Sequence, residues 1–153
     1  MTESNYAGNI IVILANLPDF LRIPVLKKRM IEFFSMTEAE RKEIINNALE
    51  AGPTIPFLNF AKLFKTWLEI LTTLSEEQRN GLFSGYINEI SEFPQKLILF
   101  NLDGILEIFL TLDEGKKEIL SQTIKKIINE LDVERKRKLM IVIPDNAKKY
   151  LKF

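Results

Sequence analysis

The stretch TEAERKEIINNALEAGPTIPFLNFAKLFKTWLEILTTL, residues 37–74, is followed directly by SEEQRNGLFSGYINEISEFPQKLILFNLDGILEIFLTL, residues 75–112. The two stretches align without a gap over 38 residues, with Pro56 above Pro94. A fixed period of this length is typical of proteins in which one helical unit stacks on copies of itself, because a single unit cannot bury its own apolar face. The alignment therefore predicts an all-α fold built from repeated units.

The same period fits the whole chain. Pro18 lies one period before Pro56, and Asp113 lies one period after Ser75. We expect a single all-helical repeat domain, a stack of four helical hairpins arranged as a HEAT-like α-solenoid or superhelical bundle. The expected units are residues 1–36, 37–74, 75–112 and 113–153.

Capping residues indicate where the helices of each unit begin. Thr37 with Glu40, and Ser75 with Gln78, have the spacing of a capping box, in which two side chains satisfy early backbone N–H groups of a helix. Proline suits the first position of a helix because the N–H that it lacks would be unpaired there anyway. The prolines expected to start second helices are Pro18, Pro56 and Pro94.

Apolar residues recur at the same place in successive units, at the spacing of amphipathic helices. We expect these columns to face the core. Among them are two columns of the first helices and one column of the second helices: Ile10, Ala48, Tyr86 and Ile124; Leu14, Gly52, Ile90 and Ile128; Leu26, Phe64 and Leu102.

The fourth unit departs from the pattern. Asp132 replaces the expected proline, and Pro144 interrupts the second helix. We expect a helix over residues 133–143, a break at Pro144 and a short helix over residues 146–151. The β-branched run 138–143 is the one strand-like segment, and we predict that it is helical because no turn residues precede it.

The same region has the spacing Leu-x-x-Glu-Arg-x-x-x-Leu, from Leu131 to Leu139, followed by Pro144. This segment resembles the unit of the helical superhelices in the magnesium-transporter N-terminal domain and in the middle domain of the flagellar switch protein. The resemblance implies a helical superhelix. It implies no function, because such units recur by convergence in many helical repeats.

Composition excludes several classes of protein. The chain has 153 residues, of which 46% are hydrophobic and 27% charged, so it is long and apolar enough to bury a core and is unlike a disordered chain. It has no Cys, which excludes disulfides and thiolate metal sites. It has no apolar run that would span a bilayer and no positively charged leader region. We expect a soluble, cytoplasmic protein without a membrane span.

The absence of His excludes most of the familiar catalytic mechanisms. His is the commonest general base and the usual partner of a Ser or Cys nucleophile. Carboxylate chemistry remains, but Glu38, Glu40 and Glu76 lie near expected helix N-termini, where negative charge complements the helix dipole. We therefore predict a non-enzymatic protein with no catalytic residue, no metal site and no cofactor.

Aromatic side chains form a stripe on one helix face at positions i, i+3, i+7 and i+10. Such a stripe suits a cofactor or a single-stranded nucleic acid when basic residues are interleaved with it. Here the nearby lysines, Lys62 and Lys65, fall on other faces, so we predict core packing. The stripe consists of Phe57, Phe60, Phe64 and Trp67.

The segment 97–112 is apolar on nearly all sides, which is typical of a helix that other helices enclose or that a partner covers. A slender stack encloses few positions, so we expect a protein partner or a homodimer contact here. The turn signal Asp103-Gly104 predicts a bend or break in this segment. The candidate interaction surface consists of Leu97, Phe100, Ile105 and Phe109.

Positive charge is concentrated in the last unit. Residues 1–112 carry ten Lys or Arg against fourteen Asp or Glu, whereas residues 113–153 carry eleven against seven. Such a concentration of charge ordinarily indicates a helix face that is exposed to solvent. The weaker alternative is a surface that binds a nucleic acid, mainly through electrostatic attraction. The candidate basic patch consists of Lys125, Lys126, Arg135, Lys136, Arg137 and Lys138.

Three functional hypotheses follow. The first is a non-catalytic protein-interaction or scaffold module that acts through the faces of the repeat stack. The second is a pocket protein for an apolar ligand between helix layers, or a carboxylate-based enzyme. A closed apolar cavity would favour the pocket protein. Three or more converging acidic residues would favour the carboxylate-based enzyme. The third is a nucleic-acid accessory protein that uses the candidate basic patch.

Overall fold

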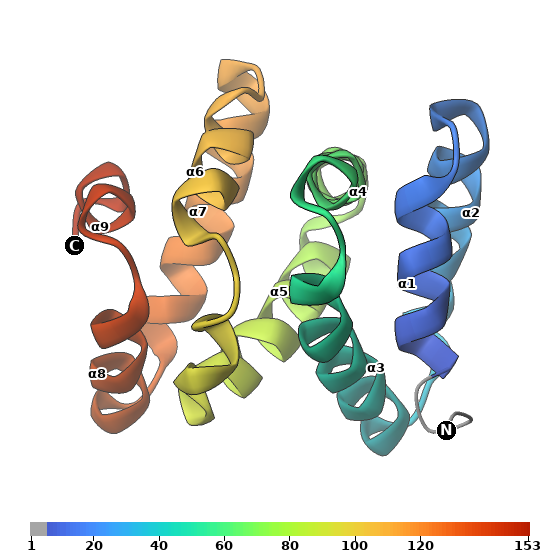
Figure 1. Cartoon of the computed structure of the whole chain (residues 1–153). Coiled ribbons are helices and arrows are strands. Elements are labelled where there is room, and N and C mark those ends of the chain that lie inside the picture. Colours follow the sequence, from blue (N-terminus) through green and yellow to red (C-terminus); the bar gives the residue numbers. More distant parts are fainter. Residues whose placement is uncertain (1–5) are drawn as a thin grey trace.

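The structure is a computed structural model that describes residues 6–153, with side chains from Ile10 onward. Within this part the fold is all-helical and contains no strand, which confirms the predicted class (Figure 1). The strand-like run 138–143 is helical up to Val142. The α-helices are α1 (Tyr6–Asn16), α2 (Asp19–Glu32), α3 (Glu38–Ala51), α4 (Phe57–Thr73), α5 (Glu76–Glu92), α6 (Leu102–Leu110), α7 (Glu114–Glu130), α8 (Val133–Val142) and α9 (Asp145–Leu151). Short 3-10 segments are η2 (Phe33–Ser35), η3 (Gly52–Thr54) and η4 (Pro94–Leu97).

The helices lie in two rows that run from α1 and α2 at one end of the molecule to α8 and α9 at the other (Figure 1). Helices α1, α3, α5 and α7 contact one another in that order, and α2, α4 and α6 do so alongside them. Contacts of α4 with α1 and α7, and of α5 with α8, join the rows. The most deeply buried apolar side chains are Leu71 of α4 and Leu120 of α7, both 0% exposed.

Both predicted capping boxes are present. The Thr37 hydroxyl accepts from the Glu40 N–H at 3.2 Å, and the Glu40 carboxylate accepts from the Thr37 N–H at 2.9 Å. The Ser75 hydroxyl accepts from the Gln78 N–H at 3.1 Å, with the reciprocal bond at 3.3 Å. Each box satisfies two N–H groups that a helix start leaves unpaired. These bonds fix the first turns of α3 and α5.

Two of the three prolines that were predicted to start second helices do so, and the prediction for the third is wrong. Pro18 and Pro56 directly precede α2 and α4. Pro94 instead begins the 3-10 segment η4, and the α-helix starts only at Leu102. Asn101 explains the late start, because its side-chain oxygen accepts from the Gly104 N–H at 3.0 Å and so caps α6.

The predicted break at Asp103-Gly104 therefore lies earlier in the chain, in residues 98–101. Asp103 and Gly104 belong to the first turn of α6. Gly104 has a packing role there, since a Cβ at this position would collide with the ring of Phe57 on α4. Glycine at this position allows α6 to approach α4 closely, and it does not bend the helix.

The C-terminal elements follow the prediction. Helix α8 ends at Val142, Pro144 follows, and α9 spans Asp145–Leu151. The Asp132 carboxylate accepts from the Arg135 N–H at 2.8 Å and caps α8, so an acidic N-cap replaces the proline of the earlier units.

Arginines near the starts of α3 and α5 bind the C-terminal ends of the preceding helices. Arg41 donates to the carbonyls of Phe33 and Phe34 at 2.9 and 2.7 Å. Arg79 donates to the carbonyls of Leu71 and Leu74 at 3.3 and 2.9 Å. The last carbonyls of a helix lack partners within the helix. The Phe33 and Leu71 carbonyls also accept from the N–H groups of Met36 and Leu74, so each arginine adds a charged donor at the junction and holds one helix against the end of the one before it.

We predict that Arg79→Ala lowers the free energy of unfolding by about 1–3 kcal/mol, because part-buried carbonyls lose a charged donor. Arg79 also donates to the Thr123 hydroxyl at 3.2 Å, so the change reaches α7 as well. Urea unfolding followed by circular dichroism measures the effect. The matched control is Arg137→Ala, whose side chain is exposed and bonds only to Glu134 among the described residues, and we expect about 0.5 kcal/mol or less for it. Equal losses in both variants would refute the role of Arg79.

Candidate functional site

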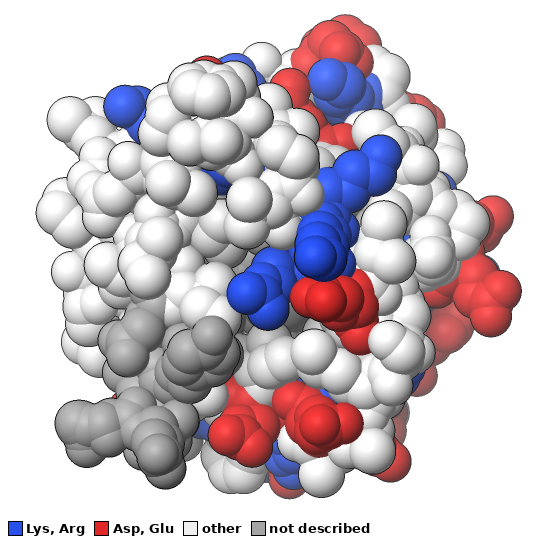
Figure 2. Space-filling view, turned by 90° about the vertical axis from the view of Figure 1, so that its right-hand side faces the viewer, with Lys and Arg blue, Asp and Glu red and all other residues white. Residues whose placement is uncertain are grey.

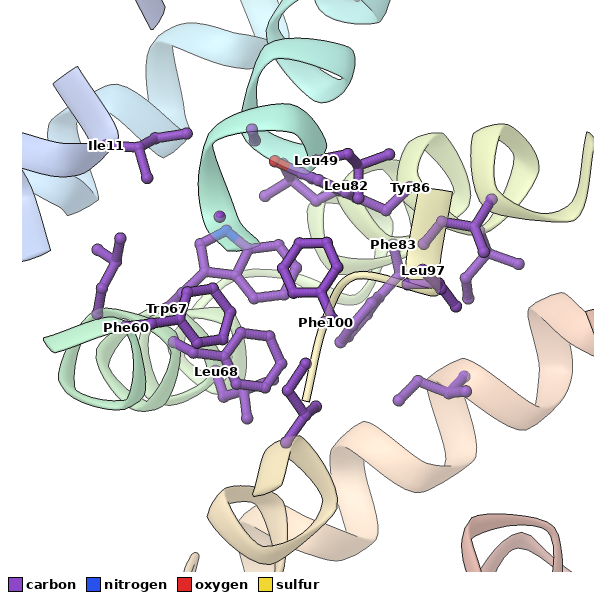
Figure 3. Close-up of a pocket in the computed structure, with 18 of the residues that line it drawn as sticks. Ile11, Leu49, Phe60, Trp67, Leu68, Leu82, Phe83, Tyr86, Leu97 and Phe100 are labelled. Atoms are coloured by element: carbon purple, nitrogen blue, oxygen red, sulfur yellow. The ribbon is translucent and has the colours of Figure 1, made fainter. Parts of the chain in front are cut away.

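An apolar cavity of about 690 Å³ lies between the two rows of helices (Figure 3). Its wall receives side chains from every helix from α1 to α9. The predicted core columns line it: Ile10, Ala48, Tyr86 and Ile124; Leu14, Gly52, Ile90 and Ile128; Leu26, Phe64 and Leu102. The apolar faces of the helices thus meet around a space that they do not completely fill.

Aromatic rings form one side of the cavity (Figure 3). The rings of Phe60 and Phe64 are stacked with centroids 5.6 Å apart, and those of Phe64 and Trp67 are stacked at 5.9 Å. Trp67 in turn meets Phe83 and Tyr86 of α5 edge-on, at 5.6 and 5.4 Å. The predicted stripe therefore packs against the core, and from Phe60 to Trp67 it also forms cavity wall.

The residues predicted as an outward interaction surface point toward this cavity. Leu97, Phe100, Ile105 and Phe109 all line it, and Phe109 is only 8% exposed. Phe100 contacts Phe60, with ring centroids 5.7 Å apart, and lies over Gly52, where a Cβ would come within 2.6 Å of the ring. The exposed large apolar side chains of the segment 97–112 are Ile98, Leu99 and Leu110.

Tyr86 of α5 lies in the cavity wall. Burial raises the pKa of Tyr86 to about 12. The hydroxyl is protonated at neutral pH, as an ordinary phenol also is. A hydroxyl of this kind is available to donate to a polar atom of a bound molecule.

The charged side chains of the wall include Arg29, Glu40 and Glu43, which are exposed and mark its rim. Hydrogen bonds from the backbone and side chain of Thr37 lower the pKa of Glu40, which is thus engaged in the capping box. Within residues 6–153, no group of three or more Asp or Glu converges as a metal site would require. The rim is therefore polar, and the interior is a hydrocarbon and aromatic surface.

A buried ion pair anchors the segment that carries Phe100. Glu89 of α5 is 6% exposed, and its carboxylate lies 2.8 Å from the Lys96 ammonium. Lys96 also donates to the Asn46 side chain on α3 and lies over the Phe93 ring, 4.7 Å from its centroid. Burial raises the pKa of Glu89, but hydrogen bonds from Lys96 and Asn46 and nearby positive charges outweigh this, so the pKa is lowered. The pair ties η4 to α3 and α5, and no sequence pattern indicated it.

The candidate basic patch is divided between two helices, and several of its charges have partners. Arg135 lies 3.6 Å from Glu92, and Arg137 lies 2.5 Å from Glu134. Lys136 donates to Asn129 and lies over the Phe153 ring. The other members are Lys125 and Lys126 on α7 and Lys138 on α8. A phosphate-binding surface at this place would have to compete with these contacts.

No known protein family, curated protein or solved structure matches the chain. Among the helices of residues 6–153, none combines the length and the apolar character that crossing a membrane requires.

We predict that Tyr86 ionises near pH 12, well above the ordinary phenol value of 10.0. The pKa of Tyr86 is higher in the folded protein than in the unfolded chain. Its contribution to the free energy of unfolding is therefore complete below the pKa of the unfolded chain, and it is lost as the pH rises through the pKa of the folded protein. The measurement is the ultraviolet absorbance titration of the protein minus that of Tyr86→Phe, with circular dichroism to follow unfolding. A difference curve centred at the ordinary phenol value would show that Tyr86 is solvated.

Proposed function

We propose that the protein is a non-catalytic binding module that takes an elongated apolar ligand into the cavity between its helix rows. The single observation that supports this function is the 690 Å³ apolar cavity, which falls within the range of about 300–1,000 Å³ typical of small-molecule sites. The cavity is open to the surface along part of its wall, and a monomer rarely exposes an apolar surface of this kind unless something covers it.

The chemistry of the wall indicates the class of ligand. Hydrocarbon and aromatic side chains favour a flexible apolar chain, because each Å² of apolar surface removed from water contributes about 25 cal/mol. Tyr86 supplies a hydrogen-bond donor inside the cavity, and the rim carries Arg29 together with Glu40 and Glu43. A long-chain fatty alcohol has the matching distribution of polar and apolar atoms, and a fatty acid offers the same hydrocarbon chain to the wall.

The cavity favours the ligand hypothesis over the protein-interaction hypothesis. The four residues that would form a protein interface, Leu97, Phe100, Ile105 and Phe109, line the cavity. Of the candidate carboxylates, Glu40 caps α3, and no three acidic side chains of residues 6–153 converge as a metal site would require. These observations support a binding role over metal-dependent carboxylate catalysis.

We further propose a HEAT-like stack of helix pairs as the architecture that produces the cavity. The capping boxes at Thr37 and Ser75 lie one 38-residue period apart, as do the arginines Arg41 and Arg79 that bind the preceding helix ends. Equivalent interactions at equivalent positions support a repeated unit. The third unit differs, because its second helix is divided by the segment 98–101.

Trp67 is the only Trp of the chain and lies in the cavity wall, so its emission reports directly on ligand entry. We predict that palmitate or hexadecanol, added below its aggregation limit, changes the Trp67 emission and saturates at one ligand per chain. Ala48→Phe places a ring in the cavity and should weaken binding by about tenfold or more, equivalent to at least about 1.4 kcal/mol.

Ala39→Phe is the matched control, because Ala39 lies on the exposed side of the same helix. It should leave the affinity unchanged. A titration without saturation, or equal weakening by both substitutions, would contradict the proposed site.

A further inference from the structure

The outer side of α1 and α2 exposes large apolar side chains at one end of the molecule. Phe20 is 74% exposed, Ile13 59% and Ile31 47%. Monomeric proteins rarely expose contiguous apolar patches of this kind unless the patch binds something. Further exposed apolar residues of the same two helices are Val12, Leu21, Ile23 and Val25.

Helix α2 is attached to the rest of the molecule by a narrow stripe. Its buried residues are Arg22, Leu26 and Met30, which follow one another at four-residue intervals. With 100° between successive residues, Phe20 and Ile31 fall on the side of the helix away from this stripe. The apolar side chains on this outer side of α2 do not pack against any other element among the described residues.

Two lysines are interleaved with these apolar residues. Viewed down the axis of α2, Lys27 lies between Ile23 and Phe20. Lys28 lies between Leu21 and the side that carries Phe20 and Ile31. Figure 2 faces this end of the molecule and shows a line of basic side chains, with an acidic side chain against its lower end and uncharged surface on either side.

The positive charge of Lys27 and Lys28 is not balanced locally. Neither forms an ion pair with another described residue, whereas Arg22 pairs with Asp19 and Arg29 lies 3.6 Å from Glu32. The first 112 residues have fewer basic than acidic residues, ten against fourteen, so a basic apolar face is a local feature.

We propose that the outer face of α1 and α2 docks onto an anionic lipid surface. Phe20, Ile13 and Ile31 enter the boundary between head groups and acyl chains, while Lys27 and Lys28 contact the lipid phosphates and carboxylates. Lysine suits this position because its long hydrocarbon stem lies along apolar surface while its ammonium group stays at the polar level.

The interleaving of charge favours lipid over a protein partner. The buried centre of a protein interface is depleted in charged residues, and Lys is among the residues least found there. A second copy of the chain on this face would place two Lys27–Lys28 pairs opposite each other, because a two-fold interface uses the same patch twice. Like charges brought together in this way oppose association.

The test is cosedimentation of the protein with vesicles, in the absence of any added ligand, so it is independent of the cavity. Vesicles of equal parts phosphatidylcholine and phosphatidylserine should retain the protein at low salt, less so at high salt, and vesicles of phosphatidylcholine alone should retain much less. The double change Lys27→Gln with Lys28→Gln should weaken partitioning by roughly thirtyfold, and Phe20→Ser should weaken it on both kinds of vesicle.

Matched controls exist elsewhere on the surface. Lys62→Gln with Lys65→Gln removes the same charge from α4, and Leu58→Ser removes an apolar side chain that is 79% exposed on the same helix. Both controls should bind vesicles as the original protein does. Absence of vesicle binding, or equal loss in the controls, would overturn the proposal and leave the face to a protein partner with acidic side chains.

Discussion

The carbonyls at the junctions η2–α3 and α4–α5 are the constraint on which the rest of the structure depends, because the helices there end and need further hydrogen-bond donors. Arg41 and Arg79 satisfy them with planar guanidinium groups that bind two carbonyls each. A guanidinium fixes direction as well as distance, so each arginine sets the angle at which the next helix leaves. The spacing of the two rows, and therefore the space between them, follows from these junctions.

The cavity also depends on the irregular third unit. If α6 began at Pro94, as the period predicts, its first turns would occupy the place of the segment that carries Phe100. Instead Phe100 lies over Gly52, and the pair Glu89–Lys96 anchors the irregular backbone. A buried ion pair is weak support for stability by itself, since desolvation offsets its attraction. Its value here is in holding one backbone conformation beside the cavity.

Local rules predicted most of the fold from the sequence. Caps at Thr37 and Ser75 and prolines at 18 and 56 involve neighbouring residues, so their geometry follows from the sequence alone. The late start of α6 did not follow, because it depends on the Asn101 cap and on contact between Gly104 and the distant Phe57.

The cavity itself could be predicted only in part. Its lining residues belong to the apolar columns, but periodicity shows which side chains face inward and not how completely they fill the interior. Leu97 and Phe109 were predicted to face outward for the same reason, since the closure of the rows is a tertiary property. The ion pair Glu89–Lys96 had no signal in the sequence, because a carboxylate on a helix flank ordinarily stays in water.

The aromatic side of the cavity determines which ligands would fit. Phe60, Phe64 and Trp67 each have two side-chain torsions, and their rings are braced against one another and against Phe83. Such rings lose little conformational entropy on binding, unlike flexible side chains such as Met. This side of the cavity therefore keeps its shape on binding, whereas Met30 and Met36 in the rest of the wall can adapt. Selectivity would then come from the fit of the ligand against the rigid aromatic side.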